Sequence, residues 1–190
     1  ASRLEVCNGL ALGGTTPSWG LVERCVTRVR LPVMMMIRPH DGGFVYSTGD
    51  LETMLADIEI ARSLGVRGVV MGALTEHRAV DRSLCQALIE AAGDLETTFH
   101  RAVDVTADPD AALDDIVELG FTRLLTSGQA TTAEKGAPLI GQLRERAGDH
   151  LIVMAGSGAN ATNAKDIVEA TGVVEIHASA SGPTHGQAGK

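Results

Sequence analysis

The chain is poor in aromatic residues and in positive charge, and it contains no long hydrophobic run. Aromatic residues make up 3% of its 190 residues, and the formal net charge is −8. Such an acidic chain has no basic stripe to neutralise phosphates, which argues against nucleic acid and against an anionic membrane surface as partners. The longest apolar run, Leu31–Ile37, contains a proline and is far too short to span a bilayer. The sequence therefore predicts a globular protein without a nucleic-acid or membrane partner.

Cysteine is also scarce. Cys7, Cys25 and Cys85 are an odd set that cannot pair completely. No Cys-x-x-Cys or His-x-x-x-His spacing is present, so there is no strong zinc signal. No signal peptide is visible, and free thiols suit a reducing compartment. We therefore expect a cytoplasmic protein.

The main pattern is a repeat of short apolar runs, six of which are followed by a helical pattern. The runs are Leu4–Val6, Val33–Ile37, Gly68–Met71, Thr97–Phe99, Leu124–Leu125, Ile152–Met154 and Val173–Ile176. We expect the helices over residues 17–29, 47–64, 81–93, 109–119, 132–147 and 160–170. Alternating strands and helices of this length indicate parallel β/α units, and eight such units close a TIM-type barrel. With seven strands, the sequence predicts an incomplete β/α barrel.

An open doubly wound sheet is the alternative architecture. That fold usually places a Gly-x-Gly-x-x-Gly turn after its first strand, whereas Cys7-Asn8-Gly9 stands here. Polar residues instead follow at least five of the strands, which favours closure into a barrel. We expect one barrel domain over residues 1–180. Residues 181–190 lack apolar periodicity and are expected to form a flexible tail.

Residues two apart in a strand share a face, so several charged side chains should point into the barrel. The expected inward residues are Glu5, Arg38, His100, Glu175 and His177. The intervening apolar residues, such as Val174 and Ile176, should face the helices. Because isolated buried ions are costly, we expect Glu5, Glu175, Arg38 and His100 to form one network, with Arg101 as a further candidate.

Several motifs in fixed order resemble the copper homeostasis protein CutC family. They are Leu4–Cys7, Gly13–Ser18, Met36–Pro39, Gly72–Glu76, Thr98–Asp104, Leu125–Gly128 and Glu175–His177. The resemblance runs from Ala1 to about Ser181. It implies a β/α barrel that binds copper and self-associates, with no settled enzymatic activity. It also implies that the first β/α unit and the last helix of the family are absent from this chain. One of the two cysteines proposed to hold Cu(I) in the family lies in that first strand, and the other corresponds to Cys7.

The residues themselves offer a possible soft-metal site. Cys7 and Met36 stand near the ends of consecutive strands, with Met34 two residues before Met36. Cu(I) prefers thiolate and thioether ligands, so these sulfurs are candidate copper ligands. The alternative is that the methionines only fill the core.

The same end of the barrel could instead belong to an enzyme that acts on a small anionic metabolite, either a phosphate or a carboxylate. The candidate catalytic residues are Glu5, Arg38, His100, Arg101 and Asp104. The candidate anion-binding loop residues are Ser127, Gly156, Ser157 and Gly158, because phosphate sites often lie at late βα loops of barrels. A third possibility is a non-catalytic scaffold whose mouth mediates protein contacts.

The missing strand has a consequence for assembly. The edges around Leu4–Cys7 and Val173–Ala178 would lack a partner strand. Unpaired edges invite pairing with another chain. We therefore expect a homo-oligomer, unless these residues are part of a longer chain.

Overall fold

The computed structural model describes residues 1–179, so the predicted tail over 181–190 lies outside the described residues. Seven parallel strands form one sheet in the order β1 to β7, each paired with the next along the chain. The strands are β1 (Leu4–Val6), β2 (Val33–Met36), β3 (Gly68–Met71), β4 (Glu96–Phe99), β5 (Arg123–Thr126), β6 (Ile152–Gly156) and β7 (Glu175–His177). All seven predicted strands are confirmed.

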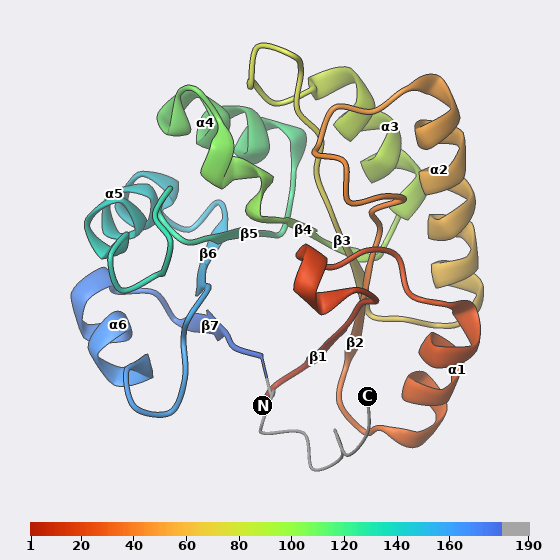
Figure 1. Cartoon of the computed structure of the whole chain (residues 1–190), viewed down its shortest axis with the longest axis horizontal. Helices are drawn as coiled ribbons and strands as arrows, with labels where there is room; N and C mark the ends of the chain where they lie inside the picture. The colour runs from red at the N-terminus through yellow and green to blue at the C-terminus, as the bar shows by residue number, and fades with distance from the viewer. Residues whose placement is uncertain (180–190) are drawn as a thin grey trace, which may run out of the picture.

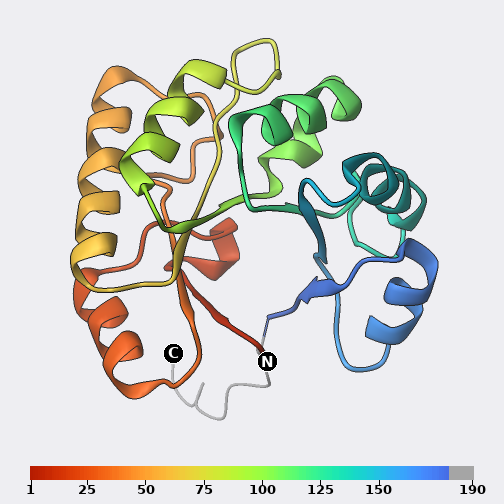
Figure 2. The ribbon, with the colours of Figure 1, turned by 180° about the vertical axis from the view of Figure 1, so that it is seen from behind.

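The sheet curls into an incomplete TIM-type barrel, with the helices on its outside (Figure 1). The helices are α1 (Trp19–Arg28), α2 (Thr48–Ser63), α3 (Arg82–Ala92), α4 (Pro109–Leu119), α5 (Ala137–Ala147) and α6 (Ala164–Thr171), with 3-10 turns η1 (Leu10–Leu12) and η2 (Arg101–Val105). The strand order never reverses, which excludes the doubly wound alternative. In the view from behind, β1 and β7 lie at the two ends of the curled sheet (Figure 2).

Three helices begin later than the sequence predicts. Ser18, and not Pro17, lies at the start of α1, where its hydroxyl accepts a hydrogen bond from Leu21 N–H. Thr132 and Asn160 instead make local turns, in which their side-chain oxygens accept hydrogen bonds from Lys135 N–H and Thr162 N–H. Such side-chain bonds compete with helix formation, so α5 and α6 start only after these turns.

The two faces of the sheet have different roles. Outward residues such as Met35, Ile37 and Phe99 are fully buried against the helices and form the main core. Met34, Met36 and Val70 form a separate small apolar cluster. The expectation for Val174 is wrong. Its side chain is 82% exposed because it precedes the short edge strand β7. None of the helices within residues 1–179 is long and apolar enough to cross a membrane.

Candidate functional site

The carboxyl ends of β1 and β2 bring two sulfur-bearing side chains together. Cys7 packs against the buried Met34–Met36–Val70 cluster. A Cβ built on Gly14 would lie 3.4 Å from Met36 Cε and 3.5 Å from Cys7 Sγ. Gly14 has a φ of 92°, a conformation that residues with a side chain rarely adopt. The glycine thus leaves room for the Cys7 thiol and the Met36 methyl group on the same side of the backbone.

The surroundings of Cys7 favour the neutral thiol. Burial raises the pKa of Cys7, and the nearby Glu5 carboxylate raises it further. Glu5 in turn accepts from His177, with 3.2 Å between Oε2 and Nε2. Residues 1–179 contain no group of three or more His, Cys, Asp or Glu side chains arranged to hold a metal. A metal bound here would therefore depend on the sulfurs of Cys7 and the methionines.

Arg101, Asp104 and Ser127 form a second, tightly bonded unit. Arg101 Nε lies 2.8 Å from Asp104 Oδ2, and Arg101 NH2 lies 2.9 Å from Ser127 Oγ. Asp104 also accepts from Thr126 Oγ1 at 2.6 Å and from the N–H groups of Ser127 and Gln129. Its carboxylate is thus fully occupied in joining η2 to the loop after β5.

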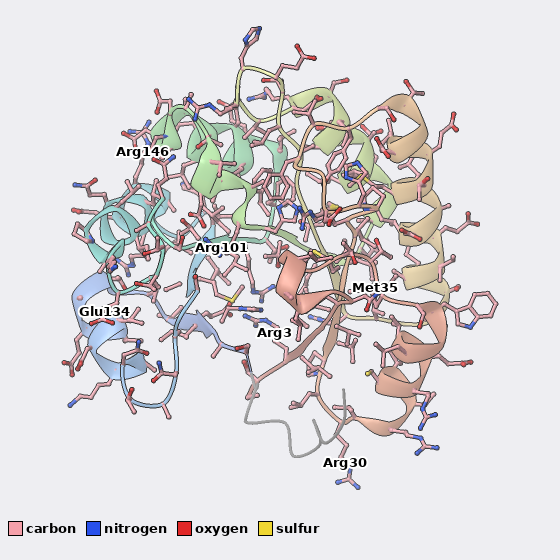
Figure 3. The ribbon with its side chains drawn as sticks, viewed as in Figure 1. Arg3, Arg30, Met35, Arg101, Glu134 and Arg146 are labelled. Carbon is pink, nitrogen blue, oxygen red and sulfur yellow. The ribbon has the colours of Figure 1, made fainter. Side chains whose placement is uncertain are left out.

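Figure 3 shows Arg101 and Arg3 toward the centre of the molecule, whereas Arg30 and Arg146 lie at its rim. Arg101 is nevertheless partly open to solvent, with 43% of its side chain exposed. It is therefore the accessible cation of the Arg101–Asp104–Ser127 unit.

Arg38 is buried and is held by the backbone. Its NH1 donates to Leu12 O at 3.1 Å and to Gly14 O at 3.0 Å, and its NH2 donates to Asp41 O at 3.3 Å. Its Cζ lies 4.9 Å from the centre of the Phe44 ring. Among the described residues, no acidic side chain forms an ion pair with this guanidinium. Arg38 is thus a buried cation without a counter-anion.

His100 is also buried, at the end of β4. Burial lowers its pKa to about 3, and the positive charge of Arg38 acts in the same direction, so the ring is neutral at physiological pH. Nδ1 accepts a hydrogen bond of 3.4 Å from Ala102 N–H. A neutral imidazole has one donor and one acceptor nitrogen, so the proton belongs on Nε2.

The expectation of one interior network is wrong. Arg38 and His100 do not join Glu5 and Glu175. Glu175 belongs to a lower layer of ion pairs at the amino ends of the strands, where the distance from Arg123 Nε to Glu175 Oε2 is 3.1 Å. The other pairs in this layer are Arg3–Glu175, Arg123–Glu96 and Arg67–Glu96. The separation arises because inward residues lie in layers, and only those at the same height can meet.

The residues around Gly156–Gly158 are held by neighbouring loops. Ser157 has a φ of 80°, and its hydroxyl donates to Thr131 O at 3.0 Å. Gly158 O accepts from the side-chain amides of Asn160 and Asn163, each at 3.1 Å. These contacts position the loop after β6 next to the loop after β5. An anion-binding role for Ser127, Gly156, Ser157 and Gly158 stays a prediction.

Sequence reasoning missed three polar residues inside the barrel or at its mouth. Arg123 lies directly before an apolar run, and the alternation through Leu125 could have placed it inside the barrel. Arg3 could have been found in the same way, through its spacing from Glu5. Tyr46 lies in the loop before α2, where no periodicity indicates its position.

Comparison with known proteins identifies close relatives. The CutC family model matches residues 1–182. A Pasteurella multocida protein described as a family protein CutC is 46% identical over 182 residues, covering 96% of this chain and 75% of that protein. A human protein described as a copper homeostasis protein cutC homolog is 46% identical over 180 residues, covering 95% of this chain and 66% of that protein.

Solved structures agree with this assignment. A CutC structure from Streptococcus agalactiae superposes with a TM-score of 0.89 and 36% identity, covering 93% of this chain and 87% of that one. A deoxyribose-phosphate aldolase from Coccidioides immitis has a TM-score of 0.65 at 18% identity, covering 84% and 66%, and shares only the fold. The matches in sequence and in structure extend over nearly the whole chain, and the chain belongs to the CutC family.

Proposed function

We propose that this protein acts in copper homeostasis and takes up Cu(I) at Cys7 and Met36. The names of its relatives support the first part, since the human protein is described by that role. The single observation that carries the second part is the approach of Cys7 Sγ and Met36 Cε to the same side of Gly14. A thiolate and a thioether are the soft donors that Cu(I) prefers.

The position of Cys7 suits uptake of an ion from solution. Met36 is buried, whereas Cys7 is only partly buried at the end of β1. Met34 lies in the same cluster and could supply a third sulfur. A copper ion would thus meet the thiol first and would then be shielded by the methionines.

The raised pKa of Cys7 makes copper uptake depend on pH. Copper must displace the thiol proton, so uptake releases a proton and strengthens as pH rises. The Glu5 carboxylate, which disfavours the free thiolate, would attract the bound cation.

An anaerobic titration with Cu(I), in competition with a chromophoric Cu(I) chelator, tests this proposal. We expect Cys7→Ser to abolish high-affinity uptake and Met36→Leu to weaken it about tenfold or more. Cys25→Ser is the matched control, because Cys25 lies in α1 on the outer side of the sheet, and should leave affinity unchanged. Equal affinities for wild type and Cys7→Ser would refute the assignment.

We also propose that the protein is cytoplasmic and self-associates. The cysteines of residues 1–179 are all free, which suits a reducing compartment. Among the described residues, the outer edges of β1 and β7 are not paired with another strand. Such edges favour contact with a second chain.

An enzyme that acts on a small anionic metabolite is the second hypothesis. The observation in its favour is the buried Arg38 guanidinium without an acidic partner. Arg101 and Asp104 support it less, because they already hydrogen bond to each other and to Ser127.

A further inference from the structure

Three buried polar atoms lack a hydrogen-bond partner within residues 1–179. They are Arg38 Nε, Tyr46 Oη and His100 Nε2. Other buried side-chain polar atoms in the described part of the chain find partners. Unsatisfied buried polar groups are rare in folded proteins, and each one costs about 1–3 kcal/mol. Three of them in one region indicate that something outside the chain satisfies them.

Arg38 and His100 both lie against the ring of Phe44. Arg38 Cζ lies 4.9 Å from the Phe44 ring centre, and the His100 ring centre lies 5.0 Å from it. Tyr46 is two residues beyond Phe44, and its hydroxyl lies within hydrogen-bonding reach of Arg38, whose charge and side-chain N–H groups both act to lower its pKa. The loop is fixed at this point by a hydrogen bond of 2.8 Å from Leu74 N–H to Phe44 O.

A glycine lies between Arg38 and His100 in the order of the strands. Continuing the register of β2 with β3 and of β3 with β4 places Gly72 between these two residues. A Cβ on Gly72 would lie 2.9 Å from His100 Nδ1, so a larger residue would displace the ring. Gly72 thus allows the His100 ring to pack directly against the backbone that follows β3.

All three atoms can donate a hydrogen. Arg38 Nε always carries one. The neutral His100 ring carries its proton on Nε2, because Nδ1 accepts from Ala102 N–H. Burial raises the pKa of Tyr46 to about 12, against the opposing effect of Arg38, so the phenol keeps its proton. Arg38 Nε and the protonated His100 Nε2 can only donate, so a partner that satisfies both must offer lone pairs, as a ligand oxygen does.

Charge narrows the class of ligand. Arg38 is 6% exposed and His100 is 4% exposed, so solvent does little to stabilise a charge here. A buried cation without a counter-charge is costly, and a bound anion would offset that cost. One positive charge matches a monoanion, and a carboxylate supplies two oxygens in one plane for a guanidinium and a second donor.

We propose that Arg38, Tyr46 and His100 form a binding site for a small carboxylate at the mouth of the barrel. This site is separate from the copper ligands, since neither Cys7 nor Met36 belongs to it. Gly14 connects the two sites. Its carbonyl accepts from Arg38 NH1, and a Cβ on it would lie against Cys7 Sγ and Met36 Cε. Because the two sites use different side chains, the two proposals can fail independently.

Titration of metal-free protein with sodium formate, sodium acetate and sodium phosphate, at constant ionic strength against chloride, tests the site. The readout is the side-chain NMR signal of Arg38 Nε–H and of the histidine rings in nitrogen-15-labelled protein. We expect saturable shifts with formate and acetate. Tyr46→Phe and His100→Gln should each weaken binding about tenfold. His77→Gln, at an exposed residue, is the matched control and should have no effect.

Arg38 itself is not varied, because it also holds the backbone at Leu12 and Gly14. Tyr46→Phe removes only one oxygen, so we expect the variant to keep the fold. Its melting temperature in the chloride buffer, compared with that of the wild type, verifies this. A response to phosphate without one to formate or acetate would overturn the carboxylate assignment. Absence of saturable shifts with every probe, or equal affinity in wild type, Tyr46→Phe and His100→Gln, would overturn the site and leave ordered water as the partner of the three donors.

Discussion

Glu5 on β1 and His177 on β7 form an ion pair of 3.2 Å across the open side of the barrel. The two strands share no backbone pairing. One layer below, Arg3 and Glu175 pair between the same two edges. Side-chain charges therefore join the two ends of the sheet where a ladder of backbone hydrogen bonds is absent.

This pair should make stability depend on pH. The hydrogen bond that His177 donates to Glu5 raises the pKa of His177, against the opposing effect of burial. A group whose pKa is higher in the folded state stabilises below its unfolded pKa of about 6.5 and loses that effect as pH rises through the folded value. We expect unfolding free energy to fall above about pH 6.5, and Glu5→Gln to flatten this slope. Urea unfolding between pH 5.5 and 8.5 measures it. An unchanged slope in Glu5→Gln would show that other groups cause it.

Asp104 should be the most sensitive residue of the loop after β5. Asp104→Asn removes the negative charge and replaces one carboxylate oxygen by an NH2 group, which cannot accept from Arg101 Nε or from the Ser127 hydroxyl. We expect a loss of about 2–3 kcal/mol in unfolding free energy, because these donors lose a charged partner in a buried setting. Chemical denaturation measures the change. Asp114→Asn, at an exposed pair with Arg146, is the control and should change stability far less. Equal effects in both variants would contradict the role of Asp104.

Arg123 should stabilise the lower layer of charges most at high pH. Burial raises the pKa of Glu96, but hydrogen bonds from Arg67 and Arg123 outweigh this and hold it below its ordinary value. Stability from such a carboxylate is present above its unfolded pKa and is lost as pH falls. Arg123→Met should cost about 2–4 kcal/mol at pH 7 and less at pH 4. Denaturation at both pH values measures this. A cost that is equal at pH 7 and pH 4 would contradict an ionic origin.

Self-association through the open edges can be observed directly. Sedimentation should reveal a species larger than one chain, and amide exchange should be slow at residues 3–7 in that species. Dilution should speed this exchange and leave the central strand β4 unaffected. A monomer with rapid exchange at residues 3–7 at every concentration would contradict the prediction.

The fold could be predicted from sequence because its signal is periodic. Each strand run is short and apolar, and glycines such as Gly120 and Gly172, both with positive φ, end the helices that follow. The positions of Cys7 and Met36 also followed from the strand order, since each lies at the carboxyl end of a strand. The TIM-type barrel required only that consecutive parallel strands lie side by side.

The partners of charged residues could not be predicted in the same way. The alternation within one strand predicts whether a side chain faces inward. Its hydrogen-bond or ion-pair partner, however, depends on how high the side chain lies in the barrel and on loops that have no periodicity. Arg38 is the main example. It contacts backbone oxygens of residues 12, 14 and 41, and no pattern in the sequence indicates them. Tyr46 was missed for the same reason.

The proposed copper function depends most on whether Cu(I) reaches the Cys7–Met36 pair. Anomalous scattering at the copper edge, from crystals soaked anaerobically with Cu(I), tests this most directly. We predict one peak within bonding distance of Cys7 Sγ and Met36 Sδ, and its loss in Cys7→Ser crystals. A peak at Cys25, a peak away from both sulfurs, or no peak in the wild type would contradict the account.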